Sequence, residues 1–204
     1  MRYEIIECVQ GDDVWHEARR GLPTSSRYPD ILAQGEGKMR GKYRRQIAYE
    51  IISGELMESY SNEKMDRGKE HEPDLRARYA FDSDVDVQKI GFVKMNPQLC
   101  RTGCSPDGLV GDQGMVEFKS MEPHLLIEML ERESPPISQA HMAQIQGGMW
   151  IMERKWCDLV VGWPKLPLLI RRVPRDEPFI GRLINEVKMF NIEVDQLVSY
   201  LKDF

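Results

Sequence analysis

The sequence predicts a mixed α/β fold, with helices and the strands of a mixed sheet in a single domain. Segments with helical and strand-like hydrophobic periods alternate along the chain, and helices separate the strands of its second half. The composition, 41% hydrophobic and 30% charged, is that of an ordinary globular protein, and 204 residues are enough for one substantial core. We therefore expect one domain over residues 1–204.

The first elements are expected to be a strand and two short helices. Residues 3–9 predict the strand, because apolar side chains are frequent there. Asp12 and Asp13 then suit a helix N-terminus, where acidic groups complement the helix dipole. Thr24, Ser25 and Ser26 are N-cap residue types and are expected to begin a second short helix that extends through Ala33.

Residues 62–81 predict a long helix with one unusual feature. Apolar residues such as Leu75 and Tyr79 fall on one side of it, and Glu72 lies on that same side. Pro73 opposes a straight helix because its ring collides with the carbonyl group four residues earlier, so we expect a kink or a new helix there. From the residues alone, a salt-bridged structural acid is the favoured interpretation of Glu72.

The remainder of the chain alternates between strands and helices. Residues 105–108, Ser-Pro-Asp-Gly, have the composition of a turn. The final helix is amphipathic and follows a pair of strands. The expected strands are 85–95, 99–104, 115–119, 156–163 and 168–173, and the expected helices are 122–131, 138–152 and 180–201.

The charge balance limits how the protein can meet an anionic partner. With 28 Lys and Arg against 33 Asp and Glu, the net charge is -5, which excludes a uniformly basic surface. Five cations and no acid occur between Lys38 and Arg45, which gives a local positive patch. A solvated helix face explains this run equally simply, so both interpretations stay open.

Several other classes of protein are excluded. The four cysteines lack the spacing of a zinc site or a disulfide framework, so we expect buried thiols. No run of about 18 apolar residues is present, and residues 1–10 mix charged with apolar side chains. We expect a soluble cytoplasmic protein without a signal peptide, membrane span or membrane partner.

Asp107, Glu117 and Lys119 form the pattern that carries chemistry. Val116 and Phe118 share one face of the expected strand, which leaves Glu117 and Lys119 together on the other. If this strand pairs with the one before it across a short turn, Asp107 lies within a few ångströms of both. Clustered carboxylates favour a hard cation such as Mg²⁺ or Mn²⁺, and such ions support phosphodiester hydrolysis. Lys119 would then orient or deprotonate the attacking water.

The triplet Glu-x-Lys is weak on its own, because it also occurs at 36–38, 153–155 and 186–188. The apolar alternation and the Pro-Asp turn upstream distinguish the one at Glu117. The alternative for Glu117 and Lys119 is a plain ion pair on an exposed strand.

These residues resemble the signature of the PD-(D/E)xK nucleases, here Pro106-Asp107 and then Glu117-Phe118-Lys119. Further motifs follow in the order found in lambda-exonuclease-like alkaline exonucleases and YqaJ-type viral recombinases, over roughly residues 10–155. They are Trp15-His16-x2-Arg19, Thr24-Ser25-Ser26, Arg67-Gly68-x3-Glu72, Cys104 to Gly108, and Met142 to Gln146.

The resemblance implies a restriction-endonuclease-like core, in which helices flank a central mixed sheet. It implies a Mg²⁺-dependent exonuclease, with Mn²⁺ as a possible substitute, that processively degrades the 5′-phosphorylated strand of duplex DNA ends. The 3′ single-stranded tails that remain serve recombination by strand annealing. Asp107, Glu117 and the Phe118 carbonyl would bind the metal, Lys119 would activate water, and Glu72 would complete the catalytic group.

The family also has a pocket for the 5′-phosphate, which by position corresponds to Arg19, Ser26, Ser105 and Gln146. An arginine can bind phosphate oxygens bidentately, and hydroxyl and amide groups add neutral donors. Each residue has a simpler alternative, since Ser26 suits a helix cap, Gln146 a surface amide and Arg19 a helix end. Gln144 is a weaker candidate for the same pocket.

For DNA binding, the resemblance implies a ring of three subunits that encloses the duplex and works beside a single-strand annealing protein. Lys38, Lys42 and Arg45 are candidates for lining the channel. Met65 lies near the position of an apolar wedge in relatives, although core packing explains it as well. Two alternatives remain: a distributive or sequence-preferring endonuclease, and a catalytically silent adaptor that binds DNA ends. The host is expected to be a bacterial or phage-infected cell.

Overall fold

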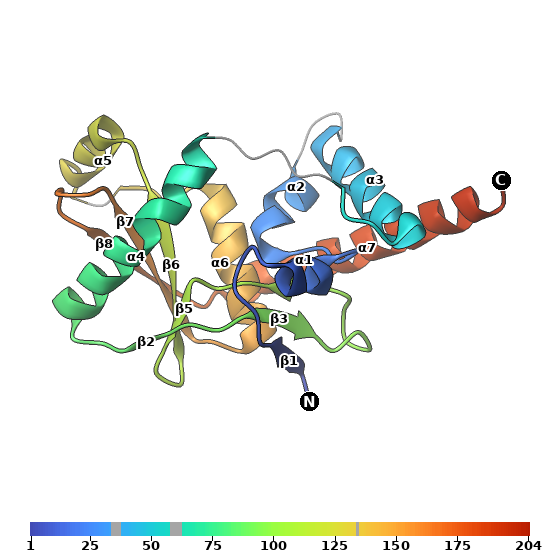
Figure 1. Ribbon diagram of the computed structural model, residues 1–204, viewed down its shortest axis with the longest axis horizontal. Coiled ribbons are helices and arrows are strands. Elements are labelled where there is room, and N and C mark those ends of the chain that lie inside the picture. The colour runs from blue at the N-terminus through green and yellow to red at the C-terminus, as the bar shows by residue number, and fades with distance from the viewer. Residues whose placement is uncertain (34–37, 58–62, 134) are drawn as a thin grey trace.

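The computed structural model describes residues 1–33, 38–57, 63–133 and 135–204, without the side chains of residues 63–66 and 69. It confirms the predicted α/β class: a mixed five-stranded sheet carries helices on both faces, and a separate three-stranded sheet lies in the N-terminal half (Figure 1). Among the helices of these described residues, none is both long and apolar enough to cross a membrane.

The five-stranded sheet has the order β2-β5-β6-β7-β8. Only β6 and β7 pair in parallel, while the other neighbours are antiparallel. A parallel pair needs a crossover, and here the crossover contains α5 (Pro123–Leu130) and α6 (Gln139–Met152). The strands are β2 (Val87–Gln88), β5 (Gly108–Val110), β6 (Gly114–Ser120), β7 (Trp156–Gly162) and β8 (Leu169–Pro174).

The second sheet pairs β1 (Tyr3–Ile6), β3 (Phe92–Met95) and β4 (Gly103–Cys104). The sequence predicted one strand over 85–95, but the chain leaves one sheet after β2 and joins the other at β3. Gly91 lies at this break, and a Cβ atom at this position would lie 2.0 Å from the Ile6 carbonyl oxygen. The close approach of β1 therefore requires glycine between the two short strands.

Helix α4 (Glu63–Ser83) covers one face of the five-stranded sheet. Leu75 and Tyr79 are fully buried on its inner side and pack against Phe118 of β6. Tyr79 Oη also donates a 2.7 Å hydrogen bond to Asp158 Oδ2 on β7. These contacts fix α4 to both central strands.

Pro73 lies inside α4, which continues past it, so of the two expected outcomes, a kink or a new helix, the new helix does not occur. Its side chain is exposed, so the ring faces solvent and does not disturb the packed side. The buried contacts of Leu75 and Tyr79 hold the following turns in place. Tertiary packing thus outweighs the local cost of proline.

Helix α6 covers the opposite face of the sheet. It begins as predicted after Ser138, whose Oγ accepts a 3.1 Å hydrogen bond from the His141 N–H. Gly148 lets it approach the strands closely, because a Cβ atom there would lie 2.9 Å from Met115 Cε. The side chain of Glu117 projects to this same face, two residues along β6 from Met115.

The remaining helices form the other half of the molecule in Figure 1. Asp12 caps the first helix by accepting a 2.7 Å hydrogen bond from the Trp15 N–H. The expected helix over 24–33 is a 3₁₀ turn followed by one short helix. The elements are α1 (Asp13–Arg19), η1 (Ser25–Arg27), α2 (Tyr28–Leu32), α3 (Lys38–Ser53) and α7 (Glu177–Lys202).

Candidate active site

The pairing of β5 with β6 brings Asp107 beside Glu117. Gly108 is opposite Val116 in this antiparallel pair, so the residue before Gly108 lies next to the following part of β6. The Phe118 N–H donates a 2.7 Å hydrogen bond to Asp107 Oδ2. The segment from Ser105 to Gly108 therefore places the Asp107 carboxylate at the edge of β6, one residue before β5 begins.

Glu117 and Lys119 lie together on the α6 face of β6. Lys119 Nζ is 3.2 Å from Glu117 Oε2, and Gln144 Nε2 on α6 donates a 2.7 Å hydrogen bond to the same oxygen. Glu117 is 2% exposed, whereas the Lys119 side chain is 26% exposed. The Glu117 carboxylate is thus buried, and the Lys119 side chain lies between it and the solvent.

The charges of this cluster shift the pKa values of its members. Burial and the neighbouring Asp107 carboxylate raise the pKa of Glu117 to about 8, although Lys119 opposes the rise. Burial lowers the pKa of Lys119, but Glu117 and Asp107 outweigh burial and raise it overall. Lys119 is therefore a charged ammonium group that donates a hydrogen bond to Glu117. The raised pKa of Glu117 means that its carboxylate binds a proton more readily than an ordinary glutamate.

Glu72 approaches the cluster from α4. Its carboxylate forms an ion pair with Arg76, one turn later on the same helix. Arg76 Nη1 also donates a 2.8 Å hydrogen bond to the Asp107 carbonyl oxygen. Burial and Asp107 raise the pKa of Glu72, against the opposing effect of Arg76. The structure thus shows Glu72 salt-bridged, as the residues alone suggested, and also close to the other carboxylates.

The donors that converge here fit a hard divalent cation. Within the described residues, no three His, Cys, Asp or Glu side chains are arranged to hold a metal ion by themselves. Asp107 and Glu117 do lie side by side, and the Phe118 carbonyl points to the same strand edge as its N–H, towards Asp107. Two carboxylates and a carbonyl suit Mg²⁺, which keeps several waters and shares its site with substrate oxygens. The raised pKa values show that further positive charge is favourable here.

Two of the predicted phosphate-binding residues, Arg19 and Ser105, both contact Trp15. Trp15 Nε1 donates a 2.8 Å hydrogen bond to Ser105 Oγ, and the Arg19 guanidinium lies 3.8 Å from the centre of the Trp15 ring. Trp15 therefore joins Arg19 to the loop that carries Asp107. Ser26 is exposed at η1, with its Oγ 3.3 Å from Thr24 Oγ1.

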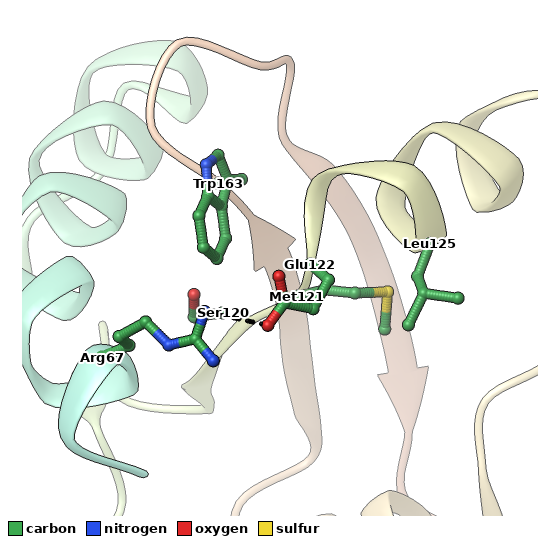
Figure 2. A pocket seen from close by; sticks show the side chains of 6 residues that line it. All are labelled: Arg67, Ser120, Met121, Glu122, Leu125 and Trp163. Atoms are coloured by element: carbon green, nitrogen blue, oxygen red, sulfur yellow. Dashed lines mark ion pairs between the residues drawn. The ribbon is translucent and has the colours of Figure 1, made fainter. Parts of the chain in front are cut away.

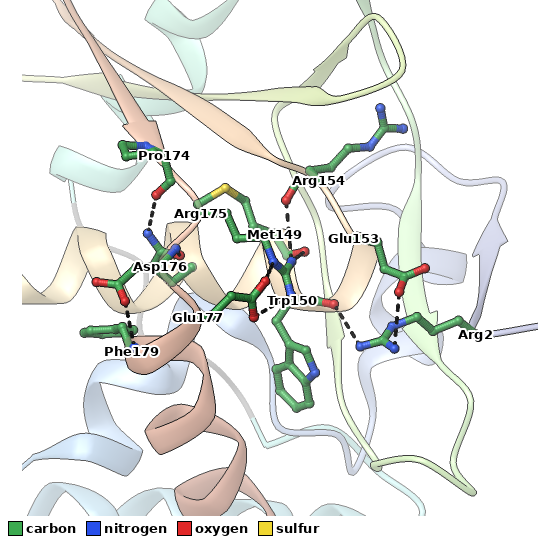
Figure 3. Close-up of polar contacts among 11 residues, drawn as sticks. Arg2, Met149, Trp150, Glu153, Arg154, Pro174, Arg175, Asp176, Glu177 and Phe179 are labelled. Atoms are coloured by element: carbon green, nitrogen blue, oxygen red, sulfur yellow. Dashed lines mark hydrogen bonds and ion pairs between the residues drawn. The ribbon is translucent and has the colours of Figure 1, made fainter.

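Gln146 lies elsewhere, which departs from the sequence prediction. It is fully buried. Its Nε2 donates a 2.9 Å hydrogen bond to the Pro174 carbonyl oxygen, and its Oε1 accepts a 2.9 Å hydrogen bond from the Asp176 N–H. Figure 3 shows Pro174 and Asp176 at the junction of β8 and α7, where Asp176 also caps α7 by accepting a hydrogen bond from the Phe179 N–H. Because Gln146 is enclosed by protein, we leave it out of the phosphate pocket.

Gln144 is the glutamine that reaches the acidic cluster. Residues two apart on a helix point about 200° apart, so Gln144 and Gln146 cannot face the same site. The sequence motif offers both, and only the orientation of α6 on the sheet decides between them. Gln144 is four residues before Gly148, so the two lie on the same side of α6, and Gly148 faces the sheet. This spacing was the signal that could have favoured Gln144.

The candidate DNA-tracking residues occupy α3. Lys38, Lys42 and Arg45 are exposed along this helix. Arg40, within the same basic run, instead bonds to Glu186 at 2.9 Å and to Glu193 at 2.8 Å on α7. The patch is therefore partly structural. The side chain of Met65, the proposed wedge, lies outside the described residues.

A pocket of about 150 Å³ opens where β6 ends, one residue beyond Lys119 (Figure 2). The ion pair between Arg67 Nη1 and Glu122 Oε1, 3.0 Å long, crosses its edge. Trp163 forms an aromatic wall, in edge contact with His71. The lining residues are Arg67, Ser120, Met121, Glu122, Leu125 and Trp163. This pocket was not predicted from the sequence.

Comparisons with known proteins support one family. The model of the YqaJ-like viral recombinase domain matches residues 14–155. The alkaline exonuclease LHK-Exo from Laribacter hongkongensis is 31% identical, with a TM-score of 0.84 over 94% of this chain and 97% of its own. The structure of LHK-Exo in complex with dAMP is 32% identical with the same coverage and TM-score.

A phage-related exonuclease from Haemophilus somnus 129PT shares the fold, with a TM-score of 0.65 at 14% identity over 88% of this chain and 96% of its own. A search of the curated proteins finds no match. The family model covers more than half of the chain, and LHK-Exo exceeds 30% identity over most of it. The chain therefore belongs to the YqaJ-like viral recombinase family and is a nuclease related to the alkaline exonucleases.

Proposed function

We propose that this protein is a Mg²⁺-dependent exonuclease that degrades the 5′-phosphorylated strand of duplex DNA ends, processively and in the 5′-to-3′ direction. The observation that carries the proposal is the cluster of Asp107, Glu117 and Lys119. Ser105 lies two residues before Asp107, and Trp15 connects it to Arg19. A relative captured with dAMP supports release of single nucleotides. The 3′ tails would serve strand annealing in a bacterial or phage-infected cell.

Asp107, Glu117 and the Phe118 carbonyl are the groups that we propose to hold the metal. When bound, Mg²⁺, or Mn²⁺ in its place, would polarise the scissile phosphate and make a bound water more acidic. Glu72 would contribute from α4 through such a water, since its carboxylate is held by Arg76. Gln144 keeps Glu117 Oε2 in place from the other side.

Lys119 would act on the attacking water at its Nζ. As an ammonium group it donates a hydrogen bond and offsets the negative charge that develops on the phosphate. Glu117 and Asp107, the two carboxylates that raise the pKa of Lys119, would be neutralised by a bound cation. Burial would then favour the neutral amine of Lys119, which can accept a proton. The same residue can thus orient the water and deprotonate it.

The decisive test of this function uses linear duplex DNA with and without a 5′-phosphate, beside closed circular duplex. We expect degradation of the phosphorylated linear DNA alone, only with Mg²⁺ or Mn²⁺, and with mononucleotides as products. Cleavage of circular DNA into discrete fragments would indicate an endonuclease instead. Binding of DNA ends without any hydrolysis would indicate a silent adaptor.

Arg19, Ser26 and Ser105 are the residues that we propose for binding the 5′-phosphate. Arg19→Ala is expected to reduce the preference for phosphorylated over dephosphorylated ends by about 10- to 100-fold, because a charge-assisted contact is worth about 1.5–3 kcal/mol. The ratio of kcat/KM values on the two substrates measures this effect. Arg20→Ala is the matched control, because Arg20 pairs with exposed Glu17. An unchanged ratio in Arg19→Ala contradicts the assignment.

We further propose a homotrimeric ring in which Lys38, Lys42 and Arg45 line the DNA channel, with a single-strand annealing protein as partner. Exchange of Lys42 and Arg45 for glutamate should shorten processive runs and make them less dependent on salt, because each lost phosphate contact removes part of the counterion release. Run lengths on long duplex DNA at two salt concentrations measure this. Lys202→Glu, at the exposed end of α7, is the control. Equal run lengths at every salt concentration exclude these residues from the channel.

A further inference from the structure

Arg76 contacts the three elements that build the active site. It extends from α4, its Nη1 bonds to the Asp107 carbonyl at the start of β5, and its guanidinium carbon lies 5.4 Å from the centre of the Phe118 ring on β6. Its Nη2 holds the Glu72 carboxylate. One side chain thus fixes the position of a helix, a loop and a strand relative to one another.

This placement is energetically expensive for an arginine. The side chain is 13% exposed, and its Nε is buried without a hydrogen-bond partner. Burial of an incompletely satisfied cation is unfavourable, and an apolar side chain of similar shape often stabilises such a site better. Packing between α4 and the sheet therefore does not explain the arginine. Its two acceptors, Glu72 and Asp107, both belong to the acidic cluster.

We propose that Arg76 is a positioning residue that sets the distance between Glu72 on α4 and the Asp107 loop for metal binding. This inference rests on the proposed function and adds a residue to its mechanism. Glu117 is positioned by Lys119 and Gln144, and the Asp107 carboxylate by the Phe118 N–H. Arg76 supplies the corresponding support for Glu72 and for the Asp107 main chain.

The sign of one effect separates positioning from simple electrostatics. A fixed positive charge beside a cation site repels the cation, so removing that charge should tighten metal binding if Arg76 acts only through its charge. If Arg76 positions the ligands, its removal should weaken binding, by about 10- to 100-fold as for other residues that orient metal ligands. The two roles predict opposite changes.

Two variants and a control exploit this difference. Arg76→Met keeps much of the packing over Phe118 and loses both bonds. Arg76→Lys keeps the charge but lacks the planar fork that reaches two acceptors at once. Arg78→Met is the matched control on the same helix, because the partners of Arg78 are the carbonyl oxygens of Trp163 and Leu166 and the carboxylate of Asp74, none of which belongs to the acidic cluster.

The experiment is a calorimetric titration of each purified full-length protein with Mn²⁺ in the absence of DNA. We expect weaker Mn²⁺ binding in both Arg76 variants, normal binding in Arg78→Met, and partial recovery of hydrolysis by Arg76→Met at high Mn²⁺. Binding in Arg76→Met that equals or exceeds the wild type overturns the inference. If Arg76→Met shows no cooperative thermal unfolding, the Mn²⁺ affinity of Arg76→Lys is the test. An affinity equal to that of the wild type in Arg76→Lys then overturns the inference. A wild-type protein that binds no Mn²⁺ refutes the proposed function itself, and this inference with it.

Discussion

Lys119→Ala is expected to lower the rate of DNA hydrolysis by about 10²- to 10⁴-fold, the usual contribution of a positioned acid or base. The loss follows from the position of Nζ, which is the partly exposed cation beside the buried Glu117 carboxylate. Metal binding should persist, because the variant removes no ligand and Gln144 still holds Glu117 Oε2. Single-turnover hydrolysis of 5′-phosphorylated duplex, together with Mn²⁺ calorimetry, measures both properties.

Lys119→Arg separates the two proposed actions of this residue. Arginine keeps the charge and donates hydrogen bonds, but it does not give up a proton in proteins. A rate near that of the wild type would assign Lys119 to orientation and charge compensation. A rate near that of Lys119→Ala would assign it to proton transfer. Undiminished hydrolysis by Lys119→Ala would remove the proposed mechanism.

Stabilisation of the protein by Mg²⁺ is expected to grow with pH, and to disappear in Glu117→Gln. The folded-state pKa of Glu117 is raised to about 8 from its ordinary value of 4.5. This group therefore favours folding below pH 4.5, and that contribution is lost as the pH rises through about 8. Mg²⁺ binds the ionised form, so its effect is larger once the proton has gone.

Thermal unfolding with and without Mg²⁺ at pH 6 and pH 8.5 tests this expectation. At 100 times the dissociation constant a ligand adds about 2.7 kcal/mol of stability. For a chain of this length, that corresponds to a rise in Tm of about 5–10 °C. Glu128→Gln, on the exposed side of α5, is the control and should behave as the wild type. A Mg²⁺ shift that is equal at both pH values, or that survives in Glu117→Gln, argues against Glu117 as a ligand.

The parts of the site that could be predicted from sequence are those set by local geometry. The alternation in residues 115–119 indicated a strand with Glu117 and Lys119 on one face, and β6 confirms that strand. Asp107 does lie beside it, but through β5, a strand that the sequence did not predict, because the expected neighbour over 99–104 contributes only β4 of the other sheet. Strand period and turn chemistry act over a few residues, so the sequence shows them directly.

The parts that could not be predicted depend on contacts between distant segments. Gly91 separates two strands because β1, some 85 residues earlier, comes within 2.0 Å of where its Cβ would lie. The choice of Gln144 over Gln146 depends on which side of α6 faces β6. Arg76 reads as an ordinary helix cation until the Asp107 loop is placed against it. Hydrophobic periodicity and secondary-structure propensity do not indicate which distant segments contact each other.

The crossover between β6 and β7 affects when this nuclease can become active. β6 pairs with β5 soon after synthesis, but its other neighbour ends only at Gly162, and α6, which supplies Gln144, lies between them. Pairing of strands so far apart in sequence is slow, because a long loop must close first. A nascent chain on the ribosome therefore carries Asp107, Glu117 and Lys119 without the enclosure that organises them. From this topology we expect the complete site to form only after the chain has been synthesised through β7.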